Sequence, residues 1–132
     1  MITQWKIATC NTRGMNNPAK QEDIIIWHIQ KQHTITCISE TRLNETTAKW
    51  LKNKNKEVTI LHTTNSDDTN GSRAGIIINR TLLPHIHQIK EQSGRCLTII
   101  LKFKNKVSIA ISSIYDKANR DKKITREITK HL

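Results

Sequence analysis

The alternation of apolar and polar residues predicts a strand, a helix and a second strand within the first forty positions. Residues 5–10 alternate between two unequal faces, as residues of a strand do. Asn17 and Pro18 form a favourable N-cap and first-turn pair, and isoleucines spaced for one broad helical stripe follow as far as Gln32. Residues 34–39 are mostly β-branched and contain neither Gly nor Pro. Such a βαβ unit places its two strands parallel, with their carboxyl ends at the same edge of the sheet.

The pattern continues to alternate beyond this unit. Residues 65–74 consist almost entirely of turn-forming residues, so we expect an exposed loop there. Asn105 joins two strand-like runs and tolerates a left-handed turn conformation, which predicts a hairpin. In chain order we expect a helix at 46–54, strands at 57–64, 75–79 and 85–90, hairpin strands at 96–104 and 106–114, and a charged helix at 119–132.

Two polar residues follow the parallel strands and are suited to a metal site. Asn11 ends the first strand and Glu40 follows the second, so both should lie at one edge of the sheet. Adjacent strands are ~5 Å apart, which lets both side chains reach one ion. Each residue also has a structural interpretation. Asn11 is a common turn former, and Glu40 can pair with Arg42 or Lys6 on the surface.

Composition limits the class of protein. A chain of 132 residues is one domain at most, or a piece of one. No run approaches the ~20 apolar residues of a membrane span, and the first residues do not resemble a signal peptide. We therefore expect an intracellular protein that is neither secreted nor bound to a membrane. Cys10, Cys37 and Cys96 stand singly in apolar runs, which favours buried, reduced thiols over a zinc site.

The charge favours a polyanionic partner. The chain carries 22 Lys and Arg against 11 Asp and Glu, a formal net charge of +11. Nucleic acid is the commonest such partner, although a solvated basic surface without one partner is the alternative. Three Trp, one Tyr and one Phe supply few stacking surfaces, so we expect contact with a duplex backbone. The candidates for phosphate contact, by charge alone, are Arg13, Arg42, Arg73 and Arg95.

Five short segments occur in the order and with the spacing of one enzyme superfamily. They span about Trp5 to Asn119 and read WKIATCNTRG, CISETRL, AGIIIN, SGRCLTIIL and SSIYD. With these segments the chain resembles the first half of the endonuclease/exonuclease/phosphatase superfamily. Within it, the chain is most similar to the apurinic-endonuclease-like domains of non-long-terminal-repeat retrotransposons.

This resemblance implies a fold, a reaction and roles for three residues. The fold is α/β (α+β): the N-terminal half of a four-layer sandwich, with a mixed sheet and flanking helices. The reaction is hydrolysis of DNA phosphodiester bonds with Mg²⁺ or Mn²⁺, which implies a nuclear location. Glu40 matches the principal metal ligand, and Asn11 matches an asparagine that contacts the metal or its water shell. Tyr115 matches a tyrosine that lies against the scissile phosphate, although its ring could simply cap a sheet edge.

The sequence also departs from the superfamily pattern. Thr34 and Ser39 stand where an acidic residue and a glutamine are usual, and Asp116 and Lys117 follow Tyr115 in place of a small residue and proline. The later Gly-Asp-Phe-Asn-like motif and the final Asp-His pair have no counterpart in the chain. We therefore expect residues 1–132 to form a single truncated domain that lacks its C-terminal half and has little catalysis alone. The six histidines are expected to be structural or exposed.

Two other functions stay open at this point. One is a basic nucleic-acid-binding fragment without chemistry, and the other is a phosphatase-type relative with the same fold. A half sandwich standing alone should also leave an apolar sheet face uncovered, lined by Ile and Cys. Such a face would favour self-association.

Overall fold

The structure is a computed structural model that describes residues 4–63 and 73–115. These parts contain seven strands, two α-helices and one 3₁₀ helix. In chain order they are β1 (Ile7–Asn11), α1 (Pro18–Gln30), β2 (Ile35–Ser39), α2 (Glu45–Lys54), β3 (Val58–His62), β4 (Ala74–Asn79), the 3₁₀ helix η1 (Arg80–His85), β5 (Ile86–Gln92), β6 (Cys96–Lys102) and β7 (Ser108–Ile114).

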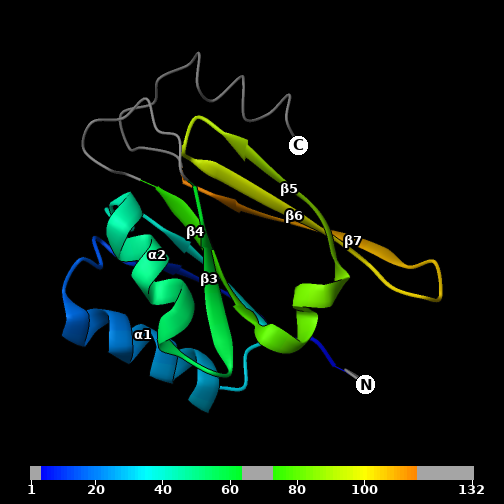
Figure 1. Cartoon of the computed structure of the whole chain (residues 1–132), viewed down its shortest axis with the longest axis horizontal. Helices are drawn as coiled ribbons and strands as arrows, with labels where there is room; N and C mark the ends of the chain where they lie inside the picture. Colours follow the sequence, from blue (N-terminus) through cyan, green and yellow to red (C-terminus); the bar gives the residue numbers. More distant parts are fainter. Residues whose placement is uncertain (1–3, 64–72, 116–132) are drawn as a thin grey trace.

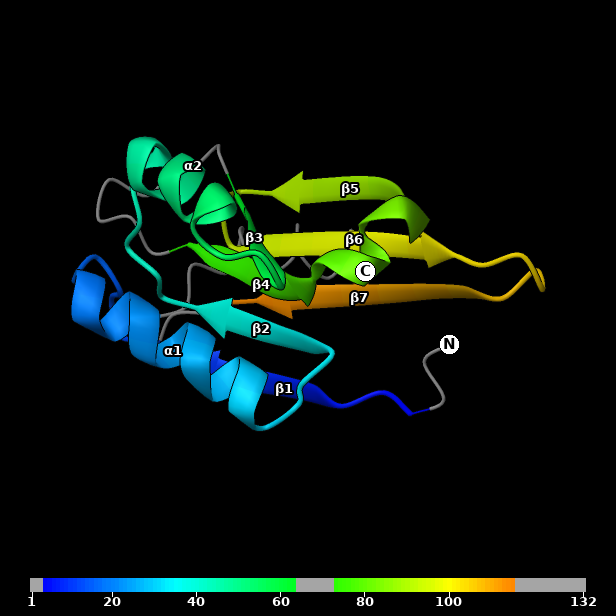
Figure 2. The ribbon, with the colours of Figure 1, turned by 60° about the horizontal axis from the view of Figure 1, so that its bottom comes forward.

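The strands form two sheets that pack face to face. The first sheet has the order β1-β2-β4-β3, in which β1 and β2 are parallel and the other pairs are antiparallel. The second sheet is antiparallel and has the order β5-β6-β7. Both helices lie on the face of the first sheet that is turned away from the second sheet (Figures 1 and 2). The α/β sandwich with a mixed sheet and flanking helices, expected from the sequence, is confirmed. The predicted helix at 119–132 and most of the predicted loop lie outside the described residues.

The helix α1 begins where its sequence predicts and ends two residues earlier. The side chain of Asn17 accepts a hydrogen bond from the backbone N–H of Ala19 at 2.8 Å, and Pro18 opens the first turn. The predicted last residue, Gln32, has a φ of 57°, so the backbone has already left the helical conformation there. Ile24 and His28 are buried on the face that meets the sheet.

The later strands differ from their predicted ranges mainly at their ends. Leu82, the buried residue of η1, anchors a 3₁₀ turn that the sequence analysis did not anticipate. In the predicted hairpin, the backbone N–H of Phe103 donates to the carbonyl of Val107 at 3.0 Å and closes the turn. The left-handed residue of this turn is Lys106, with a φ of 65°. Asn105 instead accepts a hydrogen bond through its side chain from the N–H of Val107 at 3.3 Å.

The layers pack against one another around two hydrophobic cores. The first core lies between the helices and the first sheet and consists of Met15, Ile24, Ile38, Leu43, Leu51, Val58, Ile60 and Ile77. The second core lies between the two sheets and consists of Ile35, Ile76, Ile78, Leu82, Leu97, Ile99, Leu101 and Ile111. Consecutive residues of β2 and β4 point alternately into the two cores, so most residues of both strands are buried.

The expected uncovered face of Ile and Cys is not found among the described residues. This expectation was wrong because both sheets are built within residues 4–115 and cover one another. The exposed large apolar side chains are distributed over several elements and are Ile7, Ile26, Trp50, Ile89, Val107 and Ile114. The self-association that we expected through such a face therefore has no support in the described parts.

Candidate functional site

The parallel pairing of β1 with β2 brings Asn11 and Glu40 to the same edge. Asn11 is the register partner of Ser39, the residue before Glu40. Beyond the strands, the N–H of Thr12 donates to the carbonyl of Ser39 at 2.9 Å and the N–H of Gly14 donates to the carbonyl of Glu40 at 2.6 Å. The sequence prediction that residues 11 and 40 share one edge is thus confirmed as geometry. We refer to residues 11–14, residues 40–42, Arg73, Arg95 and Tyr115 as the site edge.

Tyr115 also lies at the site edge, where the second sheet meets the first. The hydroxyl of Ser113 donates to the carbonyl of Ile38 at 3.0 Å, and this hydrogen bond ties the end of β7 to the end of β2. Tyr115 directly follows β7, and its N–H donates to the carbonyl of Arg95 at 2.8 Å. The structure therefore brings all three predicted site residues to one edge, although it does not test their chemical roles.

The side chains of Asn11 and Glu40 also make the local contacts of their structural interpretations. The Oδ1 atom of Asn11 accepts a hydrogen bond from the N–H of Arg13 at 3.0 Å, which forms an Asx turn. The Oε1 atom of Glu40 lies 3.0 Å from Nη2 of Arg42, and the Glu40 side chain is 18% exposed. The side chains of Asn11 and Glu40 thus each present an oxygen atom that is suited to bind a cation. In the structure, each of these oxygen atoms has a nitrogen of a neighbouring arginine as its partner.

Left-handed backbone conformations gather at the site edge. The φ values are 50° for Arg13, 52° for Glu40 and 53° for Arg42. Gly14 has a φ of 87°. A non-glycine residue in this region costs ~1–3 kcal/mol, and such residues often mark functional loops. A Cβ atom on Gly14 would lie 3.3 Å from Cδ of Arg42, so the glycine gives the arginine side chain room to cross the loop.

Four arginines come together at this edge, although the sequence nominated each of them by charge alone. Arg13 and Arg42 follow the ends of β1 and β2. Arg73 precedes β4, which is antiparallel to β2, and its carbonyl accepts a hydrogen bond from the N–H of Thr41 at 3.2 Å. Arg95 precedes β6, which is antiparallel to β7, and is only 4% exposed. Their convergence depends on antiparallel pairings that no local pattern reveals.

A buried histidine supports the loop that carries Glu40. Nε2 of His62 lies 2.6 Å from Oγ1 of Thr41, and both side chains are buried. Burial, reinforced by the positive charge of Arg73, lowers the pKa of His62 to about 4, so the ring is neutral near pH 7. The sequence pattern placed His62 on the same strand face as Val58 and Ile60, but it did not reveal the contact with Thr41.

The carboxylate of Glu40 and the carboxamide of Asn11 offer oxygen ligands of the kind that Mg²⁺ accepts. Magnesium keeps several waters and accepts one or two protein carboxylates, a requirement that Glu40 with Asn11 meets in part. The described residues contain no group of three or more His, Cys, Asp or Glu that could hold a metal ion. All three cysteines are free, and burial raises the pKa of the Cys37 and Cys96 thiols. A site here would therefore depend on water and substrate oxygens for its remaining ligands.

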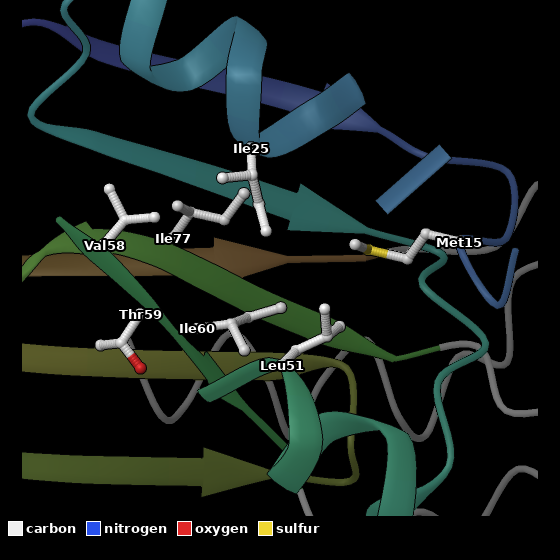
Figure 3. Close-up of a pocket in the computed structure, with 7 residues that line it drawn as sticks. All are labelled: Met15, Ile25, Leu51, Val58, Thr59, Ile60 and Ile77. Atoms are coloured by element: carbon white, nitrogen blue, oxygen red, sulfur yellow. The ribbon is translucent and has the colours of Figure 1, made fainter. Parts of the chain in front are cut away.

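A small hollow inside the first core is not a binding site. It has a volume of about 10 Å³, the space of one water molecule. Figure 3 shows its mostly apolar lining, which comes from α1, α2, the first sheet and the loop between β1 and α1. They are Met15, Ile25, Leu51, Val58, Thr59, Ile60 and Ile77. We interpret this hollow as a small packing defect.

Comparison with known proteins identifies a similar fold. No protein-family model matches the sequence, and a comparison with curated proteins gives no match either. Among solved structures, the chain is similar to an AP endonuclease from Leishmania major, with a TM-score of 0.68 and 16% sequence identity. The similarity covers 86% of this chain and 40% of the Leishmania protein, so the chain spans less than half of that protein's length. No helix in the described parts is long and apolar enough to cross a membrane.

Proposed function

We propose that this chain is the first part of a metal-dependent DNA endonuclease of the retrotransposon type. The observation that carries the proposal is the register of β1 with β2, which sets Asn11 and Glu40 at one edge with Tyr115. The fold that the chain shares with an AP endonuclease supports a nuclease over an unrelated α/β function. The net charge of +11 supports a nucleic-acid substrate over a small phosphate ester.

Each of the three residues has a distinct role in this proposal. Glu40 binds Mg²⁺ or Mn²⁺, and Asn11 contacts the same cation or its water shell. Tyr115 donates its hydroxyl hydrogen bond toward the phosphate that is cut. The cation supplies charge stabilisation of the phosphoryl and leaving oxygens. Arg42 is the present partner of Glu40, and in the loaded site it contacts a phosphate of the DNA instead.

We also propose that residues 1–132 catalyse little hydrolysis by themselves. Among the described residues, the predicted site offers the carboxylate of Glu40 and the carboxamide of Asn11, and the buried His62 is engaged by Thr41. Groups that activate water and stabilise the transferring phosphoryl group typically contribute factors of ~10² to 10⁴ in rate. The described residues supply no candidate for the water-activating group.

The test measures cation binding directly, because activity of the chain is expected to be low. Substoichiometric Mn²⁺ is added to the ¹⁵N-labelled chain, and the amide signals that broaden are mapped. Signals of residues 11–14 and 39–42 should broaden in the wild type and remain sharp in Glu40→Gln. The matched control is Glu57→Gln, an exposed carboxylate directly before β3, which should behave like the wild type. Equal broadening in Glu40→Gln would contradict the assigned ligand.

A plasmid assay complements this measurement. Any nicking of supercoiled DNA should require Mg²⁺ or Mn²⁺, disappear with EDTA, and be lost in Glu40→Gln. Nicking that persists undiminished in Glu40→Gln would refute the mechanism.

A non-catalytic nucleic-acid-binding fragment is the second candidate. It is favoured by the charge of the chain and by the ion pair that already occupies the Glu40 carboxylate. This candidate predicts salt-sensitive duplex binding that ignores both Mg²⁺ and the Glu40→Gln substitution. A phosphatase-type activity of the same fold would instead appear as turnover of small phosphate esters in a substrate panel.

A further inference from the structure

A groove of about 720 Å³ lies at the end of the second sheet remote from the site edge. Its volume falls within the range of ligand sites in proteins, ~300–1,000 Å³. β6 begins at the site edge with Cys96 and ends near the groove. The length of this strand therefore separates the groove from the site edge by ~20 Å. Figure 1 shows η1 and the turn between β6 and β7 at this remote end. The lining residues are Trp5, Thr81, Leu82, His85, Phe103, Lys104, Asn105, Val107 and Ile109.

Three flat rings from three distant segments meet in this groove. The ring centroids of Trp5 and Phe103 are 5.9 Å apart with an interplanar angle of 87°. The ring of His85 lies 4.6 Å from that of Phe103, at an angle of 30°. All three side chains are only half-buried, so the rings keep accessible surface. The chain has one Phe and three Trp, and the fold places two of these four residues here.

The charge around the groove is positive. Lys104 lines it, while Lys102 and Lys106 are exposed on either side of the same turn. None of the lining residues is Asp or Glu. Aromatic faces beside lysines suit an occupant that is flat and uncharged in one part and anionic in another. A nucleotide has this chemistry, because its base stacks on aromatic side chains and its phosphate pairs with cations.

We propose that this groove binds unpaired nucleotides of a single nucleic-acid strand. A base stacks on Phe103 together with Trp5 or His85, and Lys104 contacts the adjoining phosphate. The proposal does not depend on cation binding at Glu40, because the two places lie at opposite ends of β6. It differs from the expectation of contact with a duplex backbone, which rested on the small number of aromatic residues, because the fold places Trp5 and Phe103 together.

The test measures binding of short labelled strands to the whole chain by fluorescence anisotropy. A pentathymidylate is compared with an abasic strand that has five phosphates and no bases. Base stacking should make the pentathymidylate bind about tenfold more tightly than the abasic strand. A pentauridylate is titrated in parallel, and the tighter of the two base-bearing strands identifies the ligand as DNA or RNA. Equal affinity for the abasic and base-bearing strands would overturn the proposal.

Two pairs of variants locate the binding. Phe103→Leu should weaken pentathymidylate binding about tenfold, whereas Trp50→Leu, which removes an exposed ring on α2, should not. Lys104→Ala, at an exposed position, should weaken binding more than Lys90→Ala on β5. The lysine pair keeps the test decisive if Phe103→Leu fails to fold.

Other outcomes of these measurements would also count against the groove. Binding that is lost in Arg13→Ala but unchanged in Lys104→Ala would place the strand at the site edge and overturn the proposal. Sedimentation that reveals a dimer, abolished by Phe103→Leu, would mean that the groove holds a second copy of this chain. Either result leaves the Mn²⁺ test of Glu40 unaffected, so the two proposals fail separately.

Discussion

Acidification should destabilise the chain through the buried histidine His62. His62 is 6% exposed, and its ring faces Thr41 across 2.6 Å. Burial and the nearby charges of Arg73 and Lys52 oppose its protonation, while a hydrogen bond to the backbone of Thr63 favours it. The native state therefore keeps the ring neutral until the pH approaches about 4, whereas the unfolded chain takes up a proton near pH 6.5. The contribution to stability is complete above pH 6.5 and is lost as the pH falls toward about 4.

The size of the effect follows from proton linkage. With a pKa of about 4 in the native state and 6.5 in the unfolded state, lowering the pH from 8 to 5 costs about 2 kcal/mol of unfolding free energy. This loss is a large share of the ~5–15 kcal/mol that stabilises an ordinary domain. Because Thr41 follows Glu40, protonation of His62 should also loosen the loop at the site edge.

Urea unfolding at pH 8 and pH 5, followed by circular dichroism at constant ionic strength, measures this effect. Between pH 8 and pH 5, the unfolding free energy of the wild type should fall by about 2 kcal/mol more than that of His62→Gln. This variant keeps a polar side chain that cannot titrate. His87→Gln, an exposed histidine on β5, is the matched control and should behave like the wild type. The reasoning is refuted if wild type and His62→Gln lose the same stability, or if the His62 ring titrates near pH 6.5 in an NMR experiment.

Two further predictions concern the packing and the capping of the fold. Ile76→Ala, in the core between the sheets, should cost about 2–5 kcal/mol of unfolding free energy, because Ile76 is fully buried. In the same urea experiment Ile26→Ala, 41% exposed on α1, should cost much less, and equal losses would contradict the assigned core. Asn44→Ala should cost about 1 kcal/mol, because the Asn44 side chain caps α2 through the N–H of Thr47 at 2.8 Å. Asn53→Ala, exposed within α2, is the control, and a loss no larger for Asn44→Ala than for Asn53→Ala would count against the cap.

The βαβ unit could be predicted from the sequence because its signals are local. Asn17 and Pro18 mark the start of α1, and uninterrupted β-branched residues mark β2. In a parallel βαβ unit the carboxyl ends of both strands lie at the same edge of the sheet. The common location of Asn11 and Glu40 could therefore be predicted without the rest of the fold. Tyr115 reached the same edge in the prediction only through the resemblance to a nuclease superfamily.

The remaining features depend on pairings between distant segments. The four arginines lie together because β4 starts where β2 ends and β6 starts where β7 ends. The paired strands are far apart in the sequence, so no local pattern reveals these pairings. The contact of His62 with Thr41 and the meeting of Trp5, His85 and Phe103 have the same origin. The expected uncovered face failed for a related reason, because the sequence did not reveal that the chain builds both sheets and buries each against the other.

The outermost strands β1 and β7 lie on the same side of the sandwich, since β7 packs against β2, the neighbour of β1. Each has one flank whose amides and carbonyls meet no other strand within residues 4–63 and 73–115. A polypeptide that docks along that side can add strands to the exposed edges of both sheets. A segment docked in this way would also bring its own side chains close to Asn11 and Tyr115.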